Sequence, residues 1–137
     1  MRSRLRELQY CNLWAGTYAL LPGLIGAHTH VRSRQDLEQS LAFGVTTDLS
    51  MLMELKLAVE EKDEQSANQA NDLADLFSSG YAATAPGGHG TEYGMKFPTL
   101  RGPQEAQAWV DGRIAEGSDY IKAGVLFDRR AWRERAQ

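Results

Sequence analysis

Residues 22–31 read Pro-Gly-Leu-Ile-Gly-Ala-His-Thr-His-Val, an apolar run that follows a Pro-Gly turn and ends in two histidines one residue apart. Side chains alternate between faces along a strand, so His28 and His30 would share one face with Leu24 and Gly26. On a helix the same spacing would separate the two imidazoles by about 200° around the axis. Neutral imidazole is the commonest metal ligand. We therefore predict a buried strand with a metal site at its exit, the alternative being two half-buried histidines that bind nothing.

Length and composition limit the remaining choices. A chain of 137 residues is one domain, well short of the roughly 250 residues of a closed eight-stranded α/β barrel. The net charge of -3 provides no basic surface, so we expect no nucleic-acid partner. The single cysteine, Cys11, cannot form an internal disulfide and is typical of a reducing compartment.

The N-terminal residues raise the alternative of a secretory signal, because Arg2, Arg4 and Arg6 precede a moderately apolar segment, residues 13–27. Residues 16–17 and 22–23 interrupt that segment with Gly, Thr and Pro, and no window reaches the roughly 20 apolar residues of a membrane span. We therefore expect a cytoplasmic protein with no membrane partner. Residues 17–21 predict a further short strand.

The residues that follow alternate between helix and strand signals. Leu37 and Leu41 indicate an amphipathic helix over residues 35–43, followed by a β-branched strand at 45–49. Asp48 near the end of that strand is expected to cap or to lie in a loop, the alternative being that it faces the site. The charged run at 60–65 predicts a solvated face or an exposed loop. Apolar residues at 70, 73, 74 and 77 predict a helix that ends at Gly80.

The C-terminal half continues the alternation. A strand is expected at 81–85, followed by a glycine-rich loop at 86–94. A helix is expected at 103–116, with Pro103 in its first turn. The last expected strand, at 119–124, carries Lys122 near its carboxyl end. Strands separated by helices and short turns predict a parallel sheet, in which ligands gather at the carboxyl ends of the strands. His28, His30 and Lys122 would all lie there.

Several of these segments resemble one known family. Leu21-Pro22-Gly23-Leu24-Ile25 followed by His-Thr-His is similar to the first barrel strand of the metal-dependent amidohydrolase superfamily, whose pattern is Pro-Gly-Leu-Ile-Asp-x-His-x-His. This chain departs from the pattern at Gly26. Residues 42–47, 83–94 and 117–122 resemble the second strand, the loop after the third strand and the fourth strand in the imidazolonepropionase-like and prolidase-like branch.

The resemblance implies an α/β fold, a partial (β/α)8 TIM barrel of about four βα units. Residues 1–21 would be a remnant of the flanking β-sandwich, and residues 22–137 the N-terminal half of the barrel. It also implies a divalent metal cofactor, typically zinc and binuclear in the complete enzyme. His28 and His30 would bind the first ion, and Lys122, carboxylated by carbon dioxide, would bridge the two ions, the alternative being an exposed lysine at a strand end.

The glycine-rich loop would meet the substrate through Gly88, His89, Gly90 and Tyr93, the alternative being that His89 only orders the loop. The remaining ligands of the family, two histidines and an acid/base aspartate, would lie beyond the C-terminus of this chain.

The expected function is therefore hydrolysis of a C–N bond in a small amide, cyclic amide or dipeptide, by a chain that is a fragment and inactive alone. The alternative is a non-catalytic half-barrel that serves in binding or assembly. An open half-barrel leaves two sheet edges unpaired, so we also expect a homodimer formed through those edges.

Overall fold

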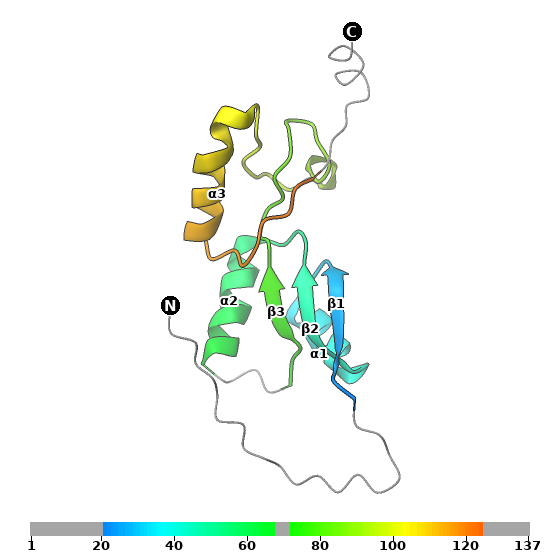
Figure 1. Cartoon of the computed structure of the whole chain (residues 1–137). Helices are drawn as coiled ribbons and strands as arrows, with labels where there is room; N and C mark the ends of the chain where they lie inside the picture. Colours follow the sequence, from blue (N-terminus) through cyan, green and yellow to red (C-terminus); the bar gives the residue numbers. More distant parts are fainter. Residues whose placement is uncertain (1–20, 68–71, 125–137) are drawn as a thin grey trace, which may run out of the picture.

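The computed structural model describes residues 21–67 and 72–124. Its centre is a parallel three-stranded sheet in the order β1-β2-β3, made of β1 (Leu24–Thr29), β2 (Val45–Ser50) and β3 (Asp75–Ser78). Helices α1 (Arg34–Ala42) and α2 (Leu55–Ser66) connect the strands (Figure 1). This confirms the α/β class. The expected N-terminal strand at 17–21 and most of the flanking-domain remnant lie outside the described residues.

Local sequence signals account for the first βαβ unit. The backbone N–H of Ser33 donates to the Asp36 carboxylate at 3.0 Å, and this contact belongs to a capping box at the start of α1. Gly44 follows the helix with φ of +82°, a conformation that costs other residues a steric clash. The predicted helix at 35–43 and strand at 45–49 are confirmed within one residue at each end.

The core lies between the sheet and the two helices. Its buried members come from β3 and the segment before it, from both helices, from the segment between β2 and α2, and from the residue that follows the histidine pair. They are Val31, Leu37, Met53, Ala58, Leu73, Ala74 and Leu76. Along β3 the pattern alternates, with Leu76 and Ser78 buried while Asp75 and Phe77 are exposed. One face of the sheet therefore packs against the helices. The other face carries exposed apolar side chains such as Ile25 and Phe77.

The helix predicted around residues 70–77 is wrong in its described part, because residues 75–78 form β3. Apolar residues at 73, 74 and 76 are all buried, and a short loop entering a strand produces the same spacing as a helical stripe. The charged run at 60–65 is not a loop but the outer part of α2. Residues 60, 63 and 64 face solvent, whereas Glu61 is buried beside Arg34, and Lys62 and Gln65 are half-buried.

The predicted third and fourth strands appear only as a minimal pairing. Ala83 and Ala123 form an isolated parallel bridge, supported by hydrogen bonds from the Ala83 N–H to the Lys122 carbonyl and from the Gly124 N–H to the Ala83 carbonyl, both 2.7 Å. The described residues therefore contain three strands in one sheet rather than four. The predicted helix at 103–116 is confirmed as η2 (Pro103–Glu105) followed by α3 (Ala106–Ala115). Figure 1 shows α3 beyond the carboxyl end of β3.

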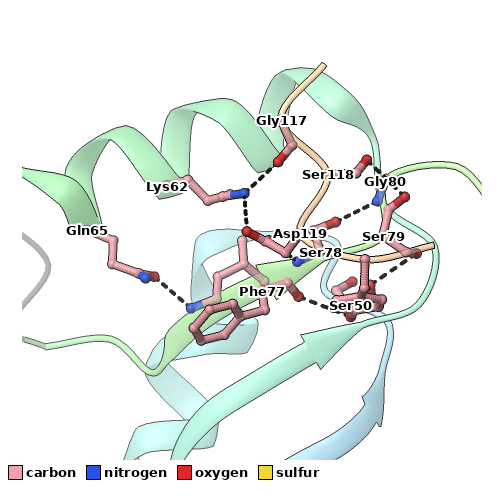
Figure 2. A network of polar contacts seen from close by, with 12 residues as sticks. Ser50, Lys62, Gln65, Phe77, Ser78, Ser79, Gly80, Gly117, Ser118 and Asp119 are labelled. Carbon is pink, nitrogen blue, oxygen red and sulfur yellow. Dashed lines mark hydrogen bonds and ion pairs between the residues drawn. The ribbon is translucent and has the colours of Figure 1, made fainter. Parts of the chain in front are cut away.

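A polar network fastens the segment after α3 to the end of β3 (Figure 2). Lys62 of α2 donates to the Gly117 carbonyl at 2.6 Å and pairs with Asp119 at 2.8 Å. The other carboxylate oxygen of Asp119 accepts from the Ser78 N–H at 2.8 Å. The Tyr120 hydroxyl donates to the Ser50 carbonyl at 2.9 Å. Residues 117–120 are thus held against the carboxyl ends of β2 and β3, which determines where Lys122 emerges.

Candidate metal and substrate site

The histidine pair lies at the carboxyl end of β1. The His28 and His30 rings have their centroids 5.4 Å apart with an angle of 62° between the ring planes. Both side chains are exposed. The backbone around them is held by β2, because the Met51 N–H donates to the Thr29 carbonyl at 2.9 Å and the Val31 N–H donates to the Ser50 hydroxyl at 3.2 Å. The two imidazoles are therefore neighbours on a supported strand exit.

The expected alternation along β1 is modified by a β-bulge. Gly26 pairs with Asp48, but the next registered pair is Thr29 with Ser50, so β1 uses one residue more than β2 over this interval. Thr29 consequently points to the face of Gly26, since its Cγ2 atom lies 2.7 Å from the position that a Gly26 Cβ would take. The prediction that Thr29 lies on the face opposite Gly26 was wrong, because simple alternation assumes an unbroken ladder.

Lys122 lies close enough for its charge to act on His30. Burial lowers the pKa of His30 below its ordinary value, and the positive charges of Lys122, His28 and Arg32 act in the same direction, against a hydrogen bond to the Leu52 backbone that raises it. Burial also lowers the pKa of Lys122. A neutral imidazole binds metal, and a neutral amine is the form that reacts with carbon dioxide. The structure thus places His28 and His30 side by side and Lys122 within electrostatic range of His30.

A cavity of about 310 Å³ adjoins His30. Its walls come from the exit of β1, from the segment between β2 and α2, and from the loop after the Ala83 bridge: His30, Val31, Arg32, Leu52, Met53, Glu54, Leu57, Tyr93 and Met95. Most of this lining is apolar, and the charged Arg32 and Glu54 have opposite signs. Pockets that bind small molecules combine an apolar lining with a few polar groups in this way.

The glycine-rich loop contributes to the cavity through Tyr93. His89 instead pairs with Glu92 at 2.9 Å and packs edge-on against the Tyr93 ring, with centroids 5.8 Å apart. Glu92 also accepts from the Gly90 N–H at 2.6 Å. A hydrogen bond from its own backbone, together with those from Gly90 and His89, lowers the pKa of the Glu92 carboxyl group. Gly90 has φ of +99° and Gly88 is buried, so both shape the backbone of the loop. His89 thus orders the loop, and Tyr93 is the member of the predicted substrate set that reaches the cavity.

Sequence reasoning missed most of the cavity. Leu52, Met53, Leu57 and Met95 come from segments without a distinctive motif, and only their shared burial beside His30 reveals a site. Asp48 was also misjudged. It neither caps a helix nor lies in a loop, but is a β2 residue with 1% of its surface exposed. A carboxylate placed within a β-branched strand was the available signal.

Within residues 21–67 and 72–124, no group of three or more His, Cys, Asp and Glu side chains is arranged to hold a metal ion. None of the helices in these ranges is long and apolar enough to cross a membrane. No family model, curated protein or solved structure matches the chain.

Proposed function

We propose that this chain contributes His28, His30 and Lys122 to the divalent-metal centre of a hydrolase that cleaves C–N bonds in amides, cyclic amides or dipeptides. The observation that carries the proposal is the pair of neighbouring imidazoles at the carboxyl end of β1, with the charge of Lys122 acting on that of His30. The parallel order β1-β2-β3, with two helices against one face, supports an origin in the first units of a (β/α)8 barrel.

The ring geometry fits a shared ion. A zinc–nitrogen bond of about 2.0–2.1 Å places each imidazole centroid about 3 Å from the ion, so two histidines on a tetrahedral zinc have centroids about 5 Å apart. The observed separation is 5.4 Å. Bound ions would acidify a water molecule and polarise the substrate carbonyl.

The described residues offer few side chains that could bind the metal. His28 and His30 leave an open coordination shell, and the third histidine of the chain, His89, is paired with Glu92. We therefore expect weak zinc binding, an uncarboxylated Lys122 and no turnover by this chain alone. The family that the sequence resembles supplies two more histidines and an aspartate from later strands.

The cavity beside His30 favours an apolar group on the substrate. A volume of about 310 Å³ accommodates one side chain of the size of leucine or phenylalanine, together with part of the adjoining backbone. Leu52, Met53, Leu57 and Met95 would contact that side chain, with Tyr93 at the loop side. An N-acyl amino acid amide or a dipeptide with an apolar residue next to the scissile bond is the substrate class that fits best.

The second candidate is a non-catalytic binding or assembly module, which one observation favours. The sheet face turned away from α1 and α2 exposes Ile25 at 63% and Phe77 at 40% of their surfaces, and exposed apolar groups of this size mark association surfaces.

Zinc titration by calorimetry separates the two candidates. We expect one weak site that is lost in His28→Ala and in His30→Ala and retained in His89→Ala, the matched control on the loop. Unchanged binding in both strand variants would refute the metal assignment. We expect no hydrolysis of apolar dipeptide amides by this chain alone. Hydrolysis that requires zinc and stops on chelation would establish the enzyme and contradict the expected lack of turnover, whereas association without zinc binding would support the module. An intact-mass measurement of the protein tests for carboxylation of Lys122.

A further inference from the structure

Asp48 is the most deeply buried acidic residue near the histidine pair. It lies in β2 with 1% of its surface exposed, and within the described part of the chain neither of its carboxylate oxygens has a hydrogen-bond partner. A buried carboxylate without a partner is strongly unfavourable, so such a group requires an explanation. The residues around it supply one.

Asp48 occupies the space that Gly26 leaves empty. The two residues are paired across β1 and β2, and a Cβ atom on Gly26 would lie 2.3 Å from the Oδ1 atom of Asp48. The same point is 2.7 Å from the Cγ2 atom of Thr29, which the β-bulge turns to this face. The carboxylate oxygen and the Cγ2 atom of Thr29, the residue between the two histidines, therefore lie at most about 5 Å apart.

Thr29 also lacks a hydrogen-bond partner for its side chain within residues 21–67 and 72–124. Its hydroxyl is also buried, and no partner for it exists among the described residues. Threonine χ1 has three staggered positions, and a rotation of about 120° exchanges the methyl group for the hydroxyl. The hydroxyl would then face the carboxylate, as a donor to an ionised acceptor, which makes a strong hydrogen bond. One rotation thus gives the Thr29 hydroxyl an acceptor and one of the two Asp48 oxygens a donor.

We propose that Asp48 is a positioning residue for the His28 and His30 pair and acts through a hydrogen bond donated by the Thr29 hydroxyl, a role that rests on the proposed metal centre. The peptide groups of Thr29 connect the two histidines, so anchoring its side chain to β2 fixes the directions of both imidazoles. The backbone bonds from Met51 and to Ser50 restrain the same strand exit. Groups that orient metal ligands in this way typically change metal affinity by about 10–100-fold when removed.

The experiment uses the full chain and zinc titration, with urea unfolding of every variant to identify loss of the fold. Thr29→Val, which replaces the hydroxyl by a methyl group of similar shape, and Asp48→Ala should each lower zinc affinity about 10–100-fold. Thr29→Ser keeps the donor and Asp48→Asn keeps an acceptor, so both should remain close to wild type.

The geometry also allows the carboxylate to be moved. Because the Cβ direction of Gly26 leads directly to the Asp48 oxygen, the double variant Gly26→Asp with Asp48→Ala should place a carboxylate in the same space and recover zinc affinity. Recovery by relocation is a result that general destabilisation of β2 does not produce. Zinc affinity that is unchanged in both Thr29→Val and Asp48→Ala would overturn the proposal.

A readout without metal distinguishes this inference from the proposed function. The imidazole NMR signals of His28 and His30 report ring orientation in the metal-free protein. If the wild-type chain binds no zinc, the proposed function fails. The positioning role would then be supported by imidazole signals that move in Thr29→Val but not in Thr29→Ser, and overturned by signals that stay in place in both.

Discussion

Replacement of Leu76 and of Phe77 by alanine tests the orientation of β3, the strand that the helical spacing of the sequence concealed. Leu76 is 1% exposed and belongs to the core between the sheet and the helices, whereas Phe77 is 40% exposed on the opposite face. If residues 73, 74 and 77 formed a helical stripe, Phe77 would be the buried member. A strand therefore predicts the larger loss of stability for Leu76→Ala, whereas a helix predicts it for Phe77→Ala.

The expected costs follow from burial. Leu76→Ala removes about three methylene-sized groups, each worth about 0.8 kcal/mol, or about 2.4 kcal/mol in transfer free energy. A residual cavity of about 60 Å³ at about 24 cal/mol per Å³ contributes about 1.5 kcal/mol more. The predicted loss of unfolding free energy is about 4 kcal/mol.

Phe77→Ala should cost less, although the side chain is larger. Full burial of a phenylalanine is worth about 1.5–3 kcal/mol, and a ring that keeps 40% of its surface exposed loses only part of this, about 1–2 kcal/mol. Its site opens to solvent, so truncation encloses no cavity. We therefore expect the two variants to differ by about 2 kcal/mol.

Urea unfolding followed by far-UV circular dichroism measures this difference. With a slope of about 1–2 kcal/mol per M for a domain of this size, the midpoints of the two variants should lie about 1–2 M apart. The slope itself should not change, which would confirm that both variants unfold from the same structure. A cost for Phe77→Ala equal to or above that for Leu76→Ala would refute the reasoning.

Two further predictions concern the network that fixes residues 117–120. Burial raises the pKa of Tyr120 to about 12 from 10.0, so the contribution of its hydroxyl to stability should be complete below pH 10 and lost as the pH rises from 10 to about 12. Over this pH range the urea midpoint of the wild-type protein should fall relative to that of Tyr120→Phe. Midpoints that change in parallel in the two proteins would contradict the assignment. Asp119→Ala removes the acceptor for Lys62 and for the Ser78 N–H and should lower the free energy of unfolding by about 1–3 kcal/mol. The control Lys56→Met, at a residue whose side chain is 80% exposed, should change it by no more than about 0.5 kcal/mol. Equal costs for the two variants would count against the network.

Features that depend on neighbours in the chain could be predicted from the sequence. The Pro-Gly turn and apolar run predicted β1, the paired leucines and Gly44 predicted α1 with its end, and Pro103 with Gly117 bounded α3. The adjacency of His28 and His30 was also predictable, since residues two apart in an extended chain lie on the same side.

Features that depend on contacts between distant segments could not be predicted from the sequence. The burial of Leu76 and the exposure of Phe77 follow from where α1 and α2 pack, and a short apolar segment has the same local pattern in a strand as in a helix. The expected fourth strand is reduced to the Ala83–Ala123 bridge, although its sequence signal is ordinary. Whether a segment forms a paired strand depends on the neighbouring strand as well as on its own sequence.

For this protein, the order of residues by itself determined the α/β class, the helix ends and the placing of two imidazoles side by side, because each rests on backbone geometry over a few residues. Only the tertiary structure decided that Asp48 fills the space above Gly26, that Tyr93 rather than His89 joins His30 at the cavity, and that Lys122 lies within electrostatic range of His30. Those arrangements depend on a β-bulge and on hydrogen bonds across up to 70 residues of sequence, and no local pattern encodes either.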